Sequence, residues 1–470
     1  MKTDQISDQN FDVVIIGGGV VGAAILRRFV LAGAKSLLIE KADDVLDGAS
    51  KANSAILHTG FDAPPGTLEQ TCIRDGYDEF MRIRERLDLP ITPCGAHVIA
   101  WTAEQADQLS SLIEKAHLNG VENVAPLSSS EIASREPYLA AGVHGGFEVP
   151  SEAIIDPWTT PHAYLLEGLV NGGQVARGRE VLNGEFDGTQ WHLTTTRETV
   201  TTRLVINAAG LYGDTVEQRL LGHPRFNIRP RKGQFLVYDK AASKLVDSIL
   251  LPVPTAHSKG IVVTRTVYGN VLVGPTAEDQ HDREDWSTDS ATLQFLREQA
   301  EAILPALADM PVTATYAGLR PATEESAYRV HSLREKSYIA ACGIRSTGLS
   351  AALGIANYVL SLHEAHGGAY DALPRPETPT GVPRISESAQ RDWQKPGNDG
   401  IVCHCELVTQ REIIQALEGP LAPQTLGGLK RLTRVTMGRC QGFYCTGRLA
   451  TLTRGYLVEN IAEPYSQDDA

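Results

Sequence analysis

The sequence of 470 residues predicts an α/β fold: a βαβ unit opens the chain, an antiparallel sheet follows, and a small cysteine-bearing helical module ends it. Three observations predict this fold. Val- and Ile-rich segments of strand length flank a glycine-rich turn near the N-terminus. Short Thr- and Val-rich segments of strand length recur between residues 191 and 273. Four of the seven cysteines lie between residues 403 and 445.

The first elements follow from local pattern. Residues 11–16 (FDVVII) are short and β-branched, which predicts a buried strand, and the chain after Gly22 predicts a helix that ends near Gly33. Residues 36–40 predict the next strand, which completes the βαβ unit. Helical patterns dominate residues 77–119, and residues 143–151 are Gly-rich and turn-prone.

The later elements are read in the same way. The expected strands are 191–202, 204–210, 233–238, 261–266, 270–273 and 337–341, and the expected helices are 159–171, 288–303 and 349–362. A Pro-rich stretch with little periodicity, 367–400, then predicts a linker or an extended surface arm.

Charge and composition exclude several classes of protein. Lys and Arg number 43 against 57 Asp and Glu, a formal net charge of −14, which argues against nucleic-acid binding. The sequence shows no apolar run long enough for a membrane span and no secretory signal at residues 1–10, so we expect a cytoplasmic protein, with peripheral membrane association left open. An odd number of cysteines argues against a disulfide framework.

The glycine-rich turn has the spacing G-x-G-x-x-G at Gly17, Gly19 and Gly22. Such glycines let a pyrophosphate approach the helix N-terminus, and Glu40 at the end of the next strand can accept the ribose hydroxyls and disfavours NADP. The alternative is an ordinary Gly-rich turn that binds no cofactor. The candidate cofactor-binding residues of this unit are Gly17, Gly19, Gly22 and Glu40, together with the neighbouring Val20, Val21 and Lys41.

Three later segments favour FAD over NAD. Residues 50–62 are small and polar and could follow a ribityl chain, residues 207–210 end a strand in small side chains, and residues 343–349 precede a helix whose amides could stabilise a reduced flavin. The further cofactor candidates are Ser50, Lys51, Asn53, Ser54, Val181, Ala209, Gly210, Gly343, Ile344, Arg345, Ser346, Thr347, Gly348 and Leu349.

Five segments carry a resemblance to known proteins: SKANSAILHTGFDAPPGTL (50–68), PRKGQFLVYDK (230–240), KGIVVTRTVYGNVLVGPTAED (259–279), GLRPATEE (318–325) and GIRSTGLSAALGIA (343–356). Together they resemble the D-amino-acid-oxidase-type flavoproteins. Within that superfamily they look like the FAD-dependent glycerol-3-phosphate dehydrogenases and the L-2-hydroxyglutarate oxidases. The resemblance implies a Rossmann-type FAD-binding domain interleaved with an antiparallel-sheet substrate domain.

The same resemblance implies the roles of several residues. His58 would lie near flavin N5 and accept a hydroxyl proton, or else only pack against the flavin. Arg320 would hold the substrate anion, or else form a structural ion pair. Lys259, Lys232 and Arg345 are weaker candidates for the same anion. Family members often have Pro where this chain has Arg265, a departure that bears on substrate choice.

The C-terminal cysteines form the pattern C-x-C…C-x4-C at Cys403, Cys405, Cys440 and Cys445. Thiolates in a reducing compartment bind zinc or an iron–sulfur cluster, and C-x-C is tight for a zinc site. The stretch GRCQGFYC resembles the bacterioferritin-associated-ferredoxin-like [2Fe–2S] domains. Basic residues outnumber acidic ones between residues 399 and 455, which suits an anionic cluster. Zinc, or no metal, remains the alternative.

These observations predict both the domains and the activity. We expect an FAD-binding domain from residues 11–85, 150–225 and 331–366, a substrate domain from 86–149 and 226–330, a linker arm at 367–398, and a [2Fe–2S]-binding domain at 399–470. The expected activity is the dehydrogenation of a small anionic secondary alcohol, first glycerol 3-phosphate, with electrons passed to a quinone, a ferredoxin or a partner subunit. The alternatives are a 2-hydroxy acid such as L-2-hydroxyglutarate, a secondary amine of the opine or hydroxyproline type, and a non-catalytic electron-transfer subunit.

Overall fold

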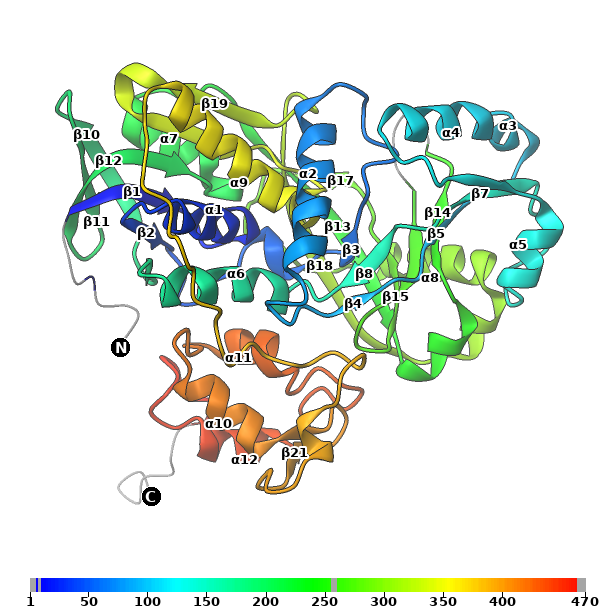
Figure 1. The fold of residues 1–470 in the computed structure, drawn as a ribbon. Helices are drawn as coiled ribbons and strands as arrows, with labels where there is room; N and C mark the ends of the chain where they lie inside the picture. Colours follow the sequence, from blue (N-terminus) through cyan, green and yellow to red (C-terminus); the bar gives the residue numbers. More distant parts are fainter. Residues whose placement is uncertain (1–5, 7–9, 255–259, 463–470) are drawn as a thin grey trace.

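A mixed sheet forms the core of one half of the molecule (Figure 1). The computed structural model describes residues 6, 10–254 and 260–462. The strand order is β10-β11-β12-β1-β2-β9, with β20 beside β12 and β19 beside β20. Strands β12, β1, β2 and β9 are parallel, as are β12 and β20. Their bounds are Asn10–Ile16 (β1), Ser36–Ile39 (β2), Gln174–Ala176 (β9), Val181–Phe186 (β10), Trp191–Thr195 (β11), Thr199–Asn207 (β12), Arg329–Leu333 (β19) and Tyr338–Cys342 (β20).

The N-terminal βαβ unit is confirmed, and it lies at the centre of this sheet. Val13, Val14 and Ile15 of β1 are completely buried because the strand has parallel neighbours and is covered by helices. Helix α9 packs against both α1 and α2, and α1 also packs against α6 (Figure 1). The helices of this half are Val20–Leu31 (α1), Leu68–Ile83 (α2), Thr159–Val170 (α6), Gly213–Leu221 (α7) and Gly348–Ala365 (α9).

A second, largely antiparallel sheet forms the other half, in the order β17-β13-β16-β15-β14-β5-β7-β6, with β18 also paired to β13. Its strands are Ala96–Ala100 (β5), Ala125–Leu127 (β6), Gly145–Val149 (β7), Ile228–Tyr238 (β13), Ile249–Pro252 (β14), Val262–Arg265 (β15), Val271–Gly274 (β16), Glu278–Asp279 (β17) and Val312–Thr323 (β18). Its helices are Ala103–Ala106 (α3), Leu109–Leu118 (α4), Ser129–Arg135 (α5) and Ser290–Ile303 (α8), and a small sheet of Ile56–Leu57 (β3), Ile91–Thr92 (β4) and Ala153–Ile155 (β8) lies between the halves.

Two expectations about this half need correction. Helices α2, α3 and α4 do make up most of the regular structure in 77–119, but the strands β4 and β5, which were not expected, interrupt it. Residues 143–151 contain the strand β7 rather than only turns. Strand β5 is buried at every position, so it shows no alternation of polar and apolar residues. Strand β7 requires a glycine at position 146, because a Cβ atom there would lie 2.3 Å from the carbonyl oxygen of Val98 on the paired strand β5.

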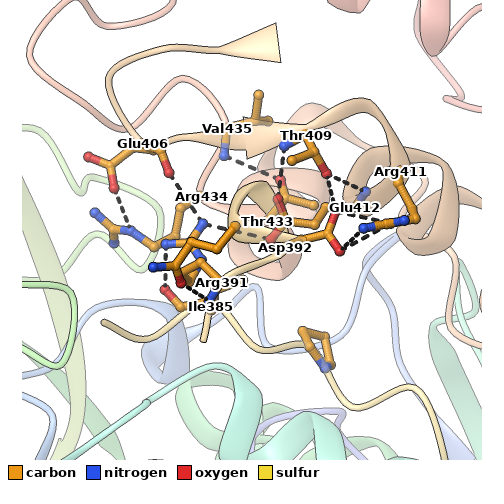
Figure 2. A network of polar contacts seen from close by, with 12 residues as sticks. Ile385, Arg391, Asp392, Glu406, Thr409, Arg411, Glu412, Thr433, Arg434 and Val435 are labelled. Atoms are coloured by element: carbon orange, nitrogen blue, oxygen red, sulfur yellow. Dashed lines mark hydrogen bonds and ion pairs between the residues drawn. The ribbon is translucent and has the colours of Figure 1, made fainter. Parts of the chain in front are cut away.

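The C-terminal module is a small separate body, orange to red in Figure 1, joined to the rest by an extended arm. Its elements are Ile401–Cys403 (β21), Val408–Thr409 (β22), Gln410–Glu418 (α10), Leu426–Thr433 (α11) and Thr446–Leu452 (α12). Figure 2 shows how the arm is tied to this module: Arg391 donates to the carbonyls of Ile385 and Glu406, and Asp392 accepts from Thr409 and Arg411. The arm is therefore an ordered strap. No helix among the described residues is long and apolar enough to span a membrane.

Candidate functional site

A cavity of about 720 Å³ gathers most of the residues singled out in the sequence. Its walls come from the β1–α1 turn, the loop that follows β2, the end of β12, strand β18 and the loop before α9. The predicted residues that line it are His58 and Arg320, with Gly17, Gly19, Val20, Val21, Glu40, Lys41, Ser50, Asn53, Ser54, Val181, Ala209, Gly210 and all of 343–349. Gly22, Lys51 and Lys232 are not part of this lining, and Lys259 lies outside the described residues.

The glycine turn has the close packing that a dinucleotide cradle requires. A Cβ atom on Gly17, whose φ is +114°, would lie 2.4 Å from the carbonyl oxygen of Ala208. A Cβ atom on Gly22 would lie 1.9 Å from the carbonyl oxygen of Gly17. Ser50 accepts a hydrogen bond from the amide of Val20 at 3.0 Å, at the start of α1. The residues therefore leave space for a phosphate group beside the N-terminus of α1.

Glu40 lies beside the position that a ribose would occupy in such a site. Its two carboxylate oxygens accept from the amides of Gly18 (2.6 Å) and Ala42 (2.8 Å), and each keeps a lone pair for a hydroxyl. Burial raises the pKa of Glu40, while these two amides and Lys41 oppose that rise. The loop 343–349 closes the cavity at the start of α9, an 18-residue helix. These residues fit FAD.

His58 is held by a buried carboxylate that the sequence analysis missed. Its Nδ1 lies 2.8 Å from Oε2 of Glu152, which is completely buried. The other oxygen of Glu152 accepts from the amide (2.6 Å) and the hydroxyl (2.9 Å) of Thr59. Because a carboxylate only accepts, Nδ1 of His58 carries the proton and Nε2 has the lone pair of a base. The two residues are 94 positions apart, so no local signal pointed to Glu152.

Three arginines give one wall of the cavity a positive charge. Burial, together with the charges of Arg231 and Arg345, lowers the pKa of Arg320 to about 10. Arg320 donates to the carbonyl of Thr276 at 3.0 Å, and among the described residues no acid forms an ion pair with it. Arg231 forms a two-point pair with Asp279 (2.6 and 3.1 Å). A partly buried guanidinium without an acidic partner, beside two others, is an arrangement that binds an anion.

The other basic candidates lie differently. Nζ of Lys232 contacts Asp285 at 2.7 Å, and Arg265 donates to the carbonyl of Asp247 at 2.7 Å; neither lines the cavity. Arg231, in contrast, lines the cavity but was not singled out in the sequence. Arg231 could have been found from the sequence, because it lies beside Lys232 in the segment 230–240 that carries the family resemblance.

The four C-terminal cysteines come together as two pairs. The thiols of Cys405 and Cys440 interact with each other, as do those of Cys445 and Cys403, and burial together with these contacts raises the pKa of the first-named thiol of each pair. The amide of Tyr444, followed by the Cys405 thiol and the amides of Gly442 and Phe443, lowers the pKa of Cys440. In the part of the chain that the structure describes, no group of three or more Cys, His, Asp or Glu side chains is arranged to hold one metal ion. Two thiol pairs with amides aimed at a sulfur fit a [2Fe–2S] cluster, in which each iron takes two thiolates.

Aromatic contacts connect the C-terminal module to the part of the chain that forms the cavity. The guanidinium of Arg434 lies 3.9 Å from the ring of Tyr268, which stacks on Trp158 with centroids 5.4 Å apart. Nε1 of Trp158 donates to the carbonyl of Lys51 at 3.1 Å, in the loop that borders the cavity. Asp44, which is buried, receives the amide and the hydroxyl of Thr425 at the start of α11. The module is therefore docked by specific contacts.

Comparisons with known proteins agree with this site. The family model "FAD dependent oxidoreductase" (DAO) matches residues 12–362, and the model "BFD-like [2Fe-2S] binding domain" matches residues 401–453. A glycerol 3-phosphate dehydrogenase of Caloramator mitchellensis is 32% identical over 466 residues, 96% of each chain. An L-2-hydroxyglutarate dehydrogenase of Indibacter alkaliphilus is 31% identical over 296 residues, 62% of this chain and 73% of that one. The FAD-bound L-alpha-glycerophosphate oxidase of Mycoplasma pneumoniae has a TM-score of 0.75 at 25% identity, covering 80% of this chain and all of that one.

Proposed function

We propose a substrate and an electron route for this chain, which belongs to the FAD dependent oxidoreductase (DAO) family and carries a BFD-like [2Fe–2S] binding domain. The substrate is a small anionic secondary alcohol, first of all glycerol 3-phosphate. The observation that carries this proposal is the pairing, in one cavity, of a base held by a carboxylate with a wall of arginines. A relative that aligns with almost the whole chain is a glycerol 3-phosphate dehydrogenase.

The cavity residues divide the work between binding and proton transfer. Arg320 and Arg345 hold the substrate anion by charge-assisted hydrogen bonds, and Arg231 adds positive potential. Glu152 keeps the proton of His58 on Nδ1, so Nε2 accepts the proton of the substrate hydroxyl. FAD, when bound, supplies the hydride acceptor at N5, and Gly17, Ser50 and the start of α9 hold it in place.

The presence of a cluster favours a dehydrogenase over an oxidase. A [2Fe–2S] centre carries one electron at a time, which suits transfer to another redox centre. The Trp158–Tyr268–Arg434 contact links the C-terminal module to the loop that borders the cavity. A quinone, a ferredoxin or a partner subunit would then receive the electrons. The cytoplasm remains the compartment that we expect for this activity, and no disulfide joins any of the seven cysteines, all of which the structure describes. Peroxide formed at the full rate of turnover with oxygen alone would count against this choice.

A 2-hydroxy acid is the second candidate, because an arginine fork binds a carboxylate as well as a phosphate and a relative acts as an L-2-hydroxyglutarate dehydrogenase. Anaerobic bleaching of the flavin absorbance separates the candidates. We expect glycerol 3-phosphate to bleach the flavin and uncharged glycerol to fail. Bleaching by L-2-hydroxyglutarate alone would move the assignment to a hydroxy acid, and bleaching only by secondary amines such as hydroxyproline would overturn the substrate class. No bleaching by any of them would favour an electron-transfer subunit.

Arg320→Met tests the binding role directly. We expect the half-saturating concentration of glycerol 3-phosphate to rise by about 100-fold, since a charged hydrogen bond contributes about 1.5–3 kcal/mol. Arg219→Met is the matched control, because Arg219 also lines the cavity but is already paired with Glu180 at 2.7 Å. An equal effect of both variants would refute the assignment of the anion site to Arg320.

A further inference from the structure

The loop between two of the cluster cysteines carries an unusual surface. Phe443 and Tyr444 lie between Cys440 and Cys445 and are 82% and 76% exposed. Among the large apolar side chains in the described ranges, Phe443 is the most exposed. The two rings touch edge to face, with centroids 5.1 Å apart. Single exposed apolar residues are common, but an adjacent aromatic pair on a cofactor-binding loop is typical of a contact surface.

Positive charge surrounds these rings. Arg439 precedes Cys440 and is 71% exposed, although it reaches Asp239 at 2.8 Å. Arg448, on α12, is exposed and donates to a neutral partner, Gln410, at 2.6 Å. The sequence from residue 420 to 458 contains no Asp or Glu, whereas the whole chain has a net charge of −14. We name the set His404, Arg439, Phe443, Tyr444 and Arg448, all exposed, the cluster face.

We propose that the cluster face docks an acidic electron-carrier protein whose own one-electron centre lies near its surface. This inference rests on the proposed function, in which electrons leave through the cluster. Electrons tunnel only over short distances, so a carrier must approach the side of the cluster loop that the chain leaves open. Aromatic rings and arginines supply contact area, and the absence of acidic residues from 420–458 favours a negatively charged partner.

The electron balance is simple. One electron leaves the reduced cluster, which returns to its oxidised form, and the centre of the carrier is reduced by one electron. Two carrier molecules are reduced for each substrate molecule oxidised, and no proton or group crosses the interface. An anionic lipid surface would also match the charge of the cluster face, so vesicles are included in the test. We favour a protein because its redox centre can approach the cluster at the contact itself.

The test uses the holoenzyme and two haem proteins of opposite charge, acidic cytochrome b5 and basic cytochrome c. Binding to immobilised oxidised enzyme is measured without substrate, at low and high salt. We expect cytochrome b5 to bind more tightly than cytochrome c, and its association to weaken as salt rises. The variants F443S/Y444S and R448E should each weaken binding of cytochrome b5 by about tenfold or more.

The controls separate this surface from the catalytic site. Arg334→Glu reverses an exposed charge just after β19, at the far end of the molecule from the C-terminal module (Figure 1), and should not affect binding. The amides that point at Cys440 belong to the backbone, so the side-chain variants should keep the cluster spectrum and the rate of flavin reduction.

Two results would overturn the inference: unchanged binding of cytochrome b5 by both cluster-face variants, or salt-dependent binding only to vesicles of equal parts phosphatidylglycerol and phosphatidylcholine. A failure of the proposed function looks different. Glycerol 3-phosphate would then leave the flavin oxidised in the wild type, while the salt-dependent binding of cytochrome b5 persisted.

Discussion

Replacing Glu152 by Gln tests how the cavity makes a base. In the wild type, Oε2 of Glu152 accepts from Nδ1 of His58 at 2.8 Å, and Oε1 accepts from Thr59. The amide of Gln is nearly the same size and can still accept from Thr59 through its oxygen. Its NH2 group then faces Nδ1, which must accept, so the proton moves to Nε2 and the base is lost.

The size of the effect follows from two contributions. Loss of a hydrogen bond to a charged group costs about 1.5–3 kcal/mol, which is about 10- to 150-fold in rate. Loss of the base itself removes a contribution of about 10²- to 10⁴-fold. We therefore expect flavin reduction at saturating glycerol 3-phosphate to slow by at least about 100-fold. The half-saturating concentration should change little, because Glu152 does not contact the arginine wall.

Anaerobic stopped-flow measurement of flavin absorbance over a range of pH provides the assay. The rate in the variant should keep rising with pH, since hydroxide must remove the proton that His58 no longer accepts. Glu136→Gln is the matched control: Glu136 is a buried carboxylate that accepts from Ser248 at 2.9 Å and lies 3.5 Å from His97, outside the cavity lining. The reasoning is refuted if Glu152→Gln reduces its flavin at the wild-type rate, or if Glu136→Gln is equally slow.

Three further predictions concern the arginine wall and the docked module. Because burial and neighbouring arginines lower the pKa of Arg320, Arg320→Met should raise the free energy of unfolding of the substrate-free protein by about 1–2 kcal/mol; a lower Tm in the variant would contradict this. Asp44→Ala removes the acceptor of the Thr425 amide and hydroxyl at a cost of about 1–3 kcal/mol. Proteolysis of the arm should then speed up while flavin reduction by substrate is unchanged; equal proteolysis would show that this contact does not dock the module. Trp158→Leu breaks the ring stack with Tyr268. Reduction of the cluster should then slow severalfold while flavin reduction keeps its rate. An unchanged rate of cluster reduction would show that the electrons follow another path.

The parts of the fold that depend on local pattern could be predicted from the sequence. The βαβ unit has an apolar strand, a glycine turn and a helix within 40 residues, so each element is visible without its neighbours. The family model confirms the C-terminal [2Fe–2S] module that the resemblance of the stretch GRCQGFYC implied, where the cysteine spacings alone left zinc open. Strands β5 and β7 could not be predicted in the same way, because β5 is buried throughout and β7 begins in Gly145 and Gly146.

The site shows the same division. Gly17 and Glu40 belong to one local motif, and both line the cavity. Glu152 escaped notice because its role exists only through contact with a residue 94 positions away. Lys232 illustrates the converse: the sequence offers a lysine beside the family segment, and the fold pairs its ammonium with Asp285, 53 residues on. Roles that depend on distant partners require the folded chain.

The most direct test of the central claim is an anaerobic single-turnover experiment in which the holoenzyme is mixed with glycerol 3-phosphate. Flavin absorbance and the electron paramagnetic resonance signal of the reduced cluster are followed in the same sample. We expect the flavin to be reduced first and the cluster signal to appear afterwards, and both changes should be lost in Arg320→Met at the same substrate concentration. A flavin that glycerol 3-phosphate leaves oxidised, or a cluster that stays oxidised beside a reduced flavin, would contradict this account.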